Sequence, residues 1–224
     1  MRTVFLVGGT ASGKSCVGRV LESLGAERID LDDVSREVLA SDDACVEELV
    51  DAFGPEVALG GALFDEEGGR WVPCDGSWSV DRAALARAAF ATSEGAARLE
   101  AVELPYIRER LADRLTAVSC ASSRPATCVV EVPLLDRVED LLPLADDVVW
   151  VRTGKDRRRA LAEGRGMDGG DFDARVKGQP TDAYLEARAT AVIDNDGDLA
   201  TLERRAREWW DANGLEGGGD HGCS

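Results

Sequence analysis

Histidine and lysine are scarce in this chain. The single histidine among 224 residues is His221, close to the C-terminus, so a Ser-His-Asp triad, a Cys-His pair or a His-ligated metal site has no plausible donor. Lysine occurs only at positions 14, 155 and 177, so 23 of the 26 basic residues are arginine. This bias fits a salt-rich cytosol and a GC-rich genome equally well.

Positive charge is also in the minority. The 43 acidic and 26 basic residues give a formal charge of −17 and a pI near 4.5. Such a chain repels nucleic-acid phosphate and anionic lipid at long range. We therefore expect small-molecule substrates, no nucleic-acid or membrane partner, and a monomer or weak homo-oligomer.

The sequence lacks CxxC pairs and long apolar runs. Its six cysteines have no zinc-like spacing, and a chain of this size does not need disulfides, so we expect reduced thiols. The first apolar run, from Val4 to Val7, is too short for a signal peptide or a membrane span. These features predict a soluble, cytoplasmic protein, and 44% apolar residues can fill one α/β core.

Apolar strand patterns alternate with helical ones along the chain. Strands are expected at 3–7, 26–30 and in TCVVEVPLL, DDVVWVRT and AVIDNDGD, and a terminal helix from Leu199. Residues 58–79 are expected to form an irregular surface excursion, and residues 80–118 to be helical with a break or kink at Pro105. The near-continuous apolar strands predict a parallel sheet covered on both faces. Beyond Asn213 we expect a disordered tail, 214–224.

The strongest motif is GGTASGKS, residues 8–15, which fits G-x-x-x-x-G-K-[ST] between the first strand and the first helix. Its backbone amides and the helix N-terminus would bind phosphate, Lys14 would reach the β/γ oxygens, and the Ser15 hydroxyl would hold Mg²⁺. An ordinary glycine-rich turn is the alternative. The nucleotide-binding residues predicted here are Gly9, Thr10, Ala11, Ser12, Gly13, Lys14, Ser15 and Cys16.

Acidic residues follow the second strand. Strand alternation would place Asp30 and Asp32 on the same side, where paired carboxylates could deprotonate an acceptor hydroxyl or reach a metal through water. The alternative is a helix cap, which fits Asp33 best and Asp32 less well.

A further acid, Glu131, lies in an otherwise apolar strand, where it is costly unless paired or near a metal. It is the predicted metal-binding partner of Ser15. The alternative is an edge position in water.

The densest basic cluster comprises Arg157, Arg158, Arg159 and Arg165. Arg165, between Gly164 and Gly166, is predicted to be a catalytic lid arginine that stabilises charge on the transferring phosphoryl group. Arg157 and Arg158 fit a solvated helix face better.

From residue 1 to about residue 205 the chain resembles the bacterial dephospho-CoA kinases, P-loop kinases related in fold to the nucleoside monophosphate kinases. The resemblance is carried in order by GGTASGKS, LESLGAERIDLDD, SREVL, DRAALARAAF, LEAVELPYI, VPLL and AVIDNDGD. It places Asp30, Asp32, Arg36, Arg82, Glu131, Arg165, Arg175 and Gln179 on family positions, and Asn195 in the last of these motifs.

Some positions depart from the family pattern. Leu104 replaces a histidine, Asp136-Arg137 replaces an aromatic-Glu pair, and Leu185 stands at a basic position. The segment around residues 60–76 looks inserted.

The resemblance implies an α/β P-loop fold in three α/β/α layers, with a sheet of about five parallel strands. It implies one kinase domain over 1–213: a core of 1–32, 127–153 and 190–213, a helical acceptor-binding region of 33–126 and a small Arg-rich lid of 154–189. The implied reaction transfers the ATP γ-phosphoryl to the ribose 3′-hydroxyl of dephospho-CoA, giving coenzyme A and ADP. ATP and Mg²⁺ would be required, with Lys14, Asp32 and Arg165 catalytic, Asp32 as the base, and Asn195 among the nucleotide-binding residues. The alternatives are a kinase for another small hydroxylated metabolite and a non-catalytic nucleotide-binding paralogue.

Overall fold

The computed structural model describes residues 1–92, 94–122 and 125–214. These residues form two compact units: residues 1–31 together with those from 114 onward, and residues 32–113. His221, Cys223 and the predicted tail from residue 215 lie outside the described residues. The first unit, called the core unit below, contains the phosphate-loop motif, and the second is called the helical unit.

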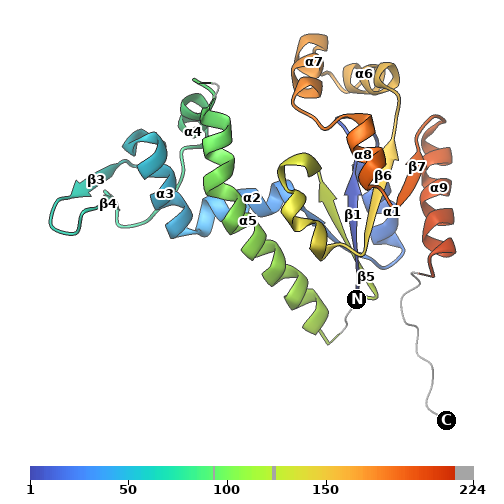
Figure 1. Ribbon diagram of the computed structural model, residues 1–224, viewed down its shortest axis with the longest axis horizontal. Coiled ribbons are helices and arrows are strands. Elements are labelled where there is room, and N and C mark those ends of the chain that lie inside the picture. The colour runs from blue at the N-terminus through green and yellow to red at the C-terminus, as the bar shows by residue number, and fades with distance from the viewer. Residues whose placement is uncertain (93, 123–124, 215–224) are drawn as a thin grey trace. The chain divides into compact units, whose positions relative to one another are not determined.

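A five-stranded parallel sheet organises the core unit (Figure 1). Its spatial order is β2-β5-β1-β6-β7. The strands are β1 (Arg2–Val7), β2 (Glu27–Asp30), β5 (Thr127–Val132), β6 (Asp147–Arg152) and β7 (Ala191–Asp194). β1 is therefore central, and its carboxyl end, where the phosphate-loop motif begins, lies between the ends of β5 and β6. Ligands of open α/β sheets bind at this edge.

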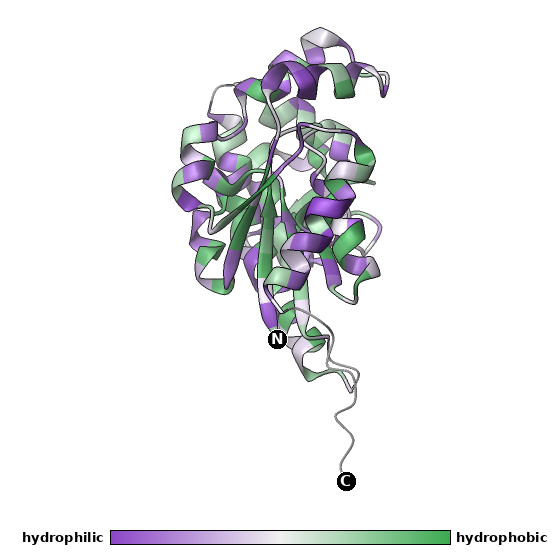
Figure 2. Ribbon diagram, turned by 90° about the vertical axis from the view of Figure 1, so that its right-hand side faces the viewer, coloured by the Kyte–Doolittle hydropathy of each residue, from purple (hydrophilic) through white to green (hydrophobic). Residues whose placement is uncertain are grey.

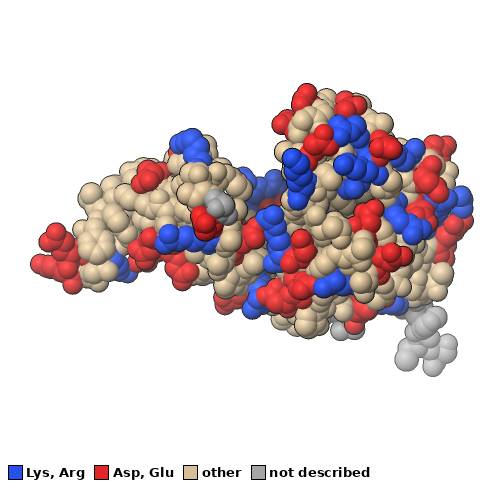
Figure 3. All heavy atoms as spheres, turned by 45° about the horizontal axis from the view of Figure 1, so that its top comes forward, with Lys and Arg blue, Asp and Glu red and all other residues tan. Residues whose placement is uncertain are grey.

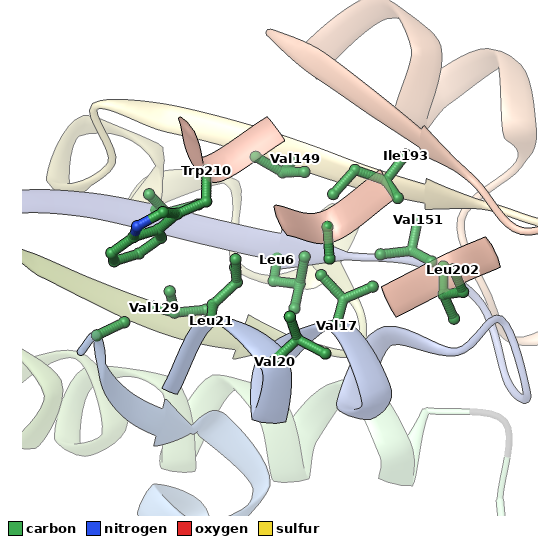
Figure 4. Packing of buried hydrophobic residues seen from close by; sticks show 13 residues of the cluster. Leu6, Val17, Val20, Leu21, Val129, Val149, Val151, Ile193, Leu202 and Trp210 are labelled. Carbon is green, nitrogen blue, oxygen red and sulfur yellow. The ribbon is translucent and has the colours of Figure 1, made fainter. Parts of the chain in front are cut away.

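One face of the sheet is covered by α1 (Lys14–Ser23) and α9 (Leu199–Ala212). Figure 4 shows Val17, Val20 and Leu21 of α1 with Leu202 and Trp210 of α9, packed against the sheet. Each such side chain contributes about 1.5–3 kcal/mol when fully buried. The periodic apolar face of α1 thus anchors the helix that follows the phosphate loop.

The opposite face of the sheet is buried as well. Because side chains alternate along a strand, Phe5, Val148 and Trp150 project away from the cluster of α1 and α9, and each is at most 5% exposed. The helix α8 (Asp182–Arg188) packs against β6, with Leu185 buried. Figure 2 shows the hydrophobic strands enclosed by helices with polar outer surfaces. The predicted α/β/α layering and parallel sheet are confirmed.

Short 3-10 segments and the helices of the lid segment also belong to the core unit. The 3-10 segments are η2 (Leu135–Arg137) and η3 (Glu139–Leu144). The predicted lid segment, residues 154–189, contains α6 (Lys155–Glu163), α7 (Gly169–Lys177) and α8. Aspartate and threonine side chains cap two of these helices, since Asp168 accepts from the Gly170 amide and Thr181 from the Tyr184 amide.

The helical unit contains α2 (Leu31–Ser41), α3 (Asp43–Phe53), α4 (Arg82–Ala89) and part of α5 (Gly95–Cys120), with the 3-10 segment η1 (Pro55–Val57). Asp42 caps α3 by accepting from the Cys45 amide at 3.1 Å, and Asp81 caps α4 by accepting from two amides at 2.9 Å. Such caps stabilise a helix by about 1 kcal/mol each. They explain why the chain starts new helices at these aspartates.

One local expectation for the helical unit is wrong, and another is wrong in part. Residues 58–79 are not irregular: they contain an antiparallel hairpin of β3 (Ala62–Asp65) and β4 (Arg70–Pro73), with Phe64 and Trp71 in edge-to-face contact at 5.3 Å. Of the glycines that suggested irregularity, Gly60, Gly61 and Gly69 have positive φ, a conformation that glycine adopts readily. The helix α5 runs from Gly95 to Cys120 and includes Pro105, so the expected break does not occur, while a kink at Pro105 stays a prediction.

The cysteines in the described part of the chain, at positions 16, 45, 74, 120 and 128, are free thiols. Among the described residues, no helix combines the length and the apolar character needed to cross a membrane.

Candidate active site

The loop between β1 and α1 has the backbone geometry that its glycines predict. Gly13 has a φ of +95°, and Ala11, with +60°, is the only non-glycine residue of positive φ among those described. A Cβ at Gly13 would lie 2.8 Å from side-chain atoms of Asn195 and Leu202, so glycine is needed there for space as well as conformation. Strained backbone of this kind is typical of ligand-binding loops.

Two residues that follow neighbouring strands bond to the backbone of this loop. The Ser12 carbonyl accepts hydrogen bonds from Thr153 Oγ1 and from Asn195 Nδ2, both at 2.8 Å, and all three residues are buried. Thr153 follows β6 and Asn195 follows β7. Asn195, predicted to bind nucleotide, is thus joined to the loop backbone, and it fixes the loop from the carboxyl edge of the sheet.

The lid segment also contacts the loop, through Gln179 and Arg158. Gln179 Oε1 accepts from the Thr10 amide at 3.0 Å and from Arg158 Nη1 at 3.4 Å, and Gln179 Nε2 donates to Thr10 Oγ1. The Arg158 guanidinium lies directly against Gly9, where a Cβ would overlap Nη1. A bulkier residue at position 9 would therefore displace this cation.

The assignment of Arg158 to a solvated helix face is wrong. Its side chain is 8% exposed, and its Nε is buried with no partner among the described residues. The sequence pattern did not reveal this, because adjacent arginines of α6 face different directions and the structure decides that Arg158 faces Gly9. A buried, incompletely bonded guanidinium beside a glycine loop fits an anionic ligand.

Arg157 is not simply solvated either. It donates to the Gly197 carbonyl, its Nε is buried without a partner in the described part of the chain, and it lines a cavity of about 410 Å³. The cavity lining comprises Arg152, Thr153, Gly154, Arg157, Asp182, Asp194, Asn195 and Asp196. Arg152 holds the pKa of Asp194 below its ordinary value, so this carboxylate stays charged. Because Thr153 and Asn195 also touch the loop, the cavity adjoins the phosphate-loop residues.

Arg165, the arginine predicted to act in catalysis, follows α6 and is exposed. Its charge reaches the first helix: burial and Glu203 raise the pKa of the Cys16 thiol, while Arg19 and Arg165 oppose that rise. Figure 3 shows basic side chains gathered over the α6–α7 part of the molecule, among acidic ones. The role of Arg165 remains a prediction.

The predicted metal ligands, Ser15 and Glu131, are brought together. Ser15 Oγ donates to Glu131 Oε2 at 2.8 Å. Glu131 is 1% exposed, because β5 lies between β2 and β1 rather than at the edge of the sheet, so the edge alternative is wrong. Its other oxygen accepts from Arg28 Nη1 at 2.6 Å, and this hydrogen bond raises the pKa of Arg28 although burial opposes it.

A hydroxyl and a carboxylate oxygen are the hard donors that Mg²⁺ prefers, and Mg²⁺ is commonly held by one or two carboxylates together with water and substrate phosphates. The Ser15 and Glu131 oxygens therefore fit this ion. A site built from protein ligands alone is not indicated, because no group of three metal-ligating side chains occurs in the described ranges.

The remaining predicted catalytic residues lie in different units. Lys14 is the first residue of α1, in the core unit. Asp32 lies in the first turn of α2, in the helical unit, since β2 ends at Asp30 and the helix begins at Leu31. Strand alternation therefore does not relate Asp32 to Asp30, and that argument was wrong. Asp33 lies in the same turn and pairs with Arg36, so it is not a preceding cap.

Known proteins are similar to this chain over most of its length. The sequence model of the dephospho-CoA kinase family matches residues 2–201. The chain belongs to the dephospho-CoA kinase family. A dephospho-CoA kinase of Frankia casuarinae is 36% identical over 210 residues, covering 94% of this chain and 82% of the relative. One from Corynebacterium diphtheriae is 34% identical over 212 residues, covering 94% of this chain and 96% of the relative.

Solved structures share the fold of this chain. The protein TT1252 of Thermus thermophilus has a TM-score of 0.71 at 26% identity, covering 95% of this chain and 97% of that one. A dephospho-CoA kinase from Campylobacter jejuni has a TM-score of 0.63 at 19% identity, covering 96% and 99%. The second likeness, at that identity, concerns the fold alone.

Proposed function

We propose that this protein transfers the γ-phosphoryl group of ATP to the ribose 3′-hydroxyl of dephospho-CoA, giving coenzyme A and ADP. Membership of the dephospho-CoA kinase family supports the reaction. The observation that carries it for this chain is the complete phosphate loop, with Gly13 in left-handed backbone, and the Ser12 carbonyl held by Thr153 and Asn195.

The loop and the lid segment bind the triphosphate. Backbone amides at the end of the loop, where α1 begins, act on its β and γ oxygens together with Lys14. Arg158, already held against Gly9, adds a second cation, and its buried Nε is an available donor. The cavity lined by Arg157 and Asn195 takes the nucleoside end of ATP, because it adjoins the loop through Asn195.

Ser15 and Glu131 would hold Mg²⁺, which neutralises charge on the β and γ oxygens when bound. Before nucleotide arrives, the Ser15 hydroxyl donates to Glu131, so both oxygen donors are already adjacent. Preorganised donors cost no rearrangement during the reaction.

Asp32 serves as the base for the acceptor. The 3′-hydroxyl oxygen forms the new bond to the γ-phosphorus, the bond to the ADP oxygen breaks, and the hydroxyl proton passes to the Asp32 carboxylate. Arg165 stabilises the charge on the transferring group. The helical unit, which contains Asp32, supplies acceptor binding.

The test is an ADP-release assay with dephospho-CoA and with a panel of other small alcohols, with the phosphorylated position identified by mass spectrometry and NMR. We expect turnover with dephospho-CoA and phosphate on its ribose 3′ oxygen. Lys14→Ala should keep the fold and lose most transfer, because its charge acts on the oxygens that become more negative. Turnover only with another alcohol would reject the proposed acceptor.

A further inference from the structure

Glu131 is held between three segments of the core unit. Its Oε2 accepts from Ser15, at the start of α1, and its Oε1 accepts from Arg28 of β2 at 2.6 Å. Gly18, in the middle of α1, faces the same carboxylate, since a Cβ there would lie 2.6 Å from Oε1. The two oxygens of one buried carboxylate are thus assigned to different partners.

Glycine at position 18 is explained by this carboxylate. Glycine is unfavourable in a helix interior, yet Gly18 is buried, has an ordinary helical position and takes no part in a turn. An added Cβ would also lie 3.2 Å from Arg28 Cδ. The missing side chain leaves the space that Glu131 and Arg28 occupy.

We infer that Arg28 is a positioning residue for Mg²⁺ binding, acting through Glu131, with Gly18 providing the space that the pair requires. This inference rests on the proposed function, in which Ser15 and Glu131 hold the ion. Arg28 fixes Oε1, so Oε2 faces Ser15.

The physical reason is that a buried carboxylate needs a partner. Glu131 is 1% exposed, and without Arg28 its Oε1 would lose a charge-assisted hydrogen bond in a site that water barely reaches. The carboxylate would then be free to turn from Ser15 toward another donor. Residues that orient metal ligands in this way change metal affinity about 10–100-fold when they are replaced.

The experiment measures binding of a non-hydrolysable ATP analogue by calorimetry, with excess Mg²⁺ and with EDTA. The ratio of the two dissociation constants reports the gain in affinity due to the ion. We expect Arg28→Gln to reduce this gain about 10–100-fold while leaving the affinity in EDTA within about twofold, and Arg28→Lys to restore part of it because the charge remains.

A second variant and a matched control separate positioning from folding. Gly18→Ala keeps every charge and favours the helix, so it should fold, and the displaced Glu131 should reduce the Mg²⁺-dependent gain as Arg28→Gln does. Glu22→Gln is the control, because the exposed Glu22 also pairs with Arg28, at 3.4 Å from its Nε, whereas Glu131 accepts from Arg28 Nη1. It should leave the gain unchanged. Thermal unfolding of each variant verifies that it is folded.

The outcomes distinguish this inference from the proposed function. If Glu131→Gln loses the gain while Arg28→Gln and Gly18→Ala keep it, Glu131 binds the ion and the inference about Arg28 is wrong. If the wild type shows no gain, or Glu131→Gln retains it, the proposed metal site fails and the inference fails with it. If Glu131→Gln, Arg28→Gln and Gly18→Ala all lose the Mg²⁺-dependent gain while Glu22→Gln keeps it, the result supports both the proposed metal site and the inference about Arg28.

Discussion

Gln179 joins the lid segment to the phosphate loop, because its Oε1 accepts a hydrogen bond from the Thr10 amide nitrogen, 3.0 Å away. Its amide nitrogen donates to the Thr10 hydroxyl, so one side chain bonds both the backbone and the side chain of that residue. Gln179 also accepts from Arg158, which lies against Gly9. The neutral side-chain amide of Gln179 therefore links Arg158 of the lid segment to the phosphate loop.

This link predicts that the charge at position 179 controls ATP affinity. Gln179→Glu should weaken ATP binding at least about tenfold more than Gln179→Ala, equal to about 1.4 kcal/mol. The added carboxylate would both repel the triphosphate and neutralise Arg158. Titration of ATP into the three proteins at fixed Mg²⁺ measures the effect. Equal affinities of the Glu and Ala variants would show that phosphate does not approach Thr10.

The two lid arginines are expected to act at different stages. Arg158→Ala should weaken ATP binding and lower turnover together, because its guanidinium is already beside the loop in the free protein. Arg165→Ala should lower turnover by about 10²-fold or more while changing ATP affinity less, because its proposed role is to stabilise charge that develops on the transferring group in the transition state.

Arg159→Ala is the matched control for these variants. Its guanidinium stacks on Phe172 at 5.2 Å and pairs with Asp173 within the lid segment. Steady-state kinetics with direct ATP titration should find it close to wild type. If Arg158→Ala leaves both ATP affinity and turnover intact, the assignment of Arg158 to the triphosphate is wrong.

In the helical unit, Glu103 predicts a pH dependence of stability. Burial raises the pKa of Glu103 to about 7, the neighbouring Glu100 adds to the rise, and Arg82 opposes it. An unfolded glutamate titrates near pH 4.3, so roughly between pH 4 and 7 the folded protein binds more protons than the unfolded chain. The stabilisation from protonated Glu103 is complete below about pH 4 and is lost as pH rises through about 7.

Glu103→Gln cannot ionise and should remove this loss. The melting temperature of Glu103→Gln minus that of wild type should be larger at pH 8 than at pH 4.5. Thermal unfolding of both proteins at both pH values measures this difference. Glu109→Gln, at an exposed position of the same helix, should show the same difference from wild type at both. A Glu103→Gln effect that does not change with pH would contradict burial of this carboxylate.

Much of the fold could be predicted because local pattern and tertiary structure agree. The apolar runs around Phe5, Val130 and Val149 indicated buried parallel strands, and the structure has them at the centre of the sheet. The hairpin at 62–73 could not be predicted in the same way. Its strands are only four residues each, and its side chains are mostly half-buried or exposed, so they leave little alternation to detect.

The site was predictable where its residues are adjacent in the sequence. It was less predictable where the order of strands in the sheet determines which residues are in contact. Residues 8–15 form a continuous motif, but Arg28 meets Glu131 only because β2 pairs with β5, which no local spacing reveals. Thr153 likewise reaches Ser12 because β6 lies beside β1. Arg158 was wrongly assigned to a solvated face because its sequence neighbours are also arginines. Only the packing of α6 decides which of them lies against Gly9.

The base assignment predicts a specific defect for Asp32→Asn. Asparagine keeps the size and much of the hydrogen bonding of aspartate but cannot accept the proton, so ATP binding should survive while transfer falls by roughly 10²–10⁴-fold. If Asp32 only stabilises the first turn of α2, the substitution should cost about 1 kcal/mol of stability at most and leave turnover intact.

Single-turnover formation of product at saturating ATP and dephospho-CoA tests the central claim most directly, with wild type and Asp32→Asn compared side by side. The proposed reaction predicts that wild type forms coenzyme A carrying the new phosphate on the ribose 3′ oxygen, and that Asp32→Asn forms the same product at least about 10²-fold more slowly. Equal rates would contradict the role of Asp32. No 3′-phosphorylated product from the wild type would contradict the proposed function itself.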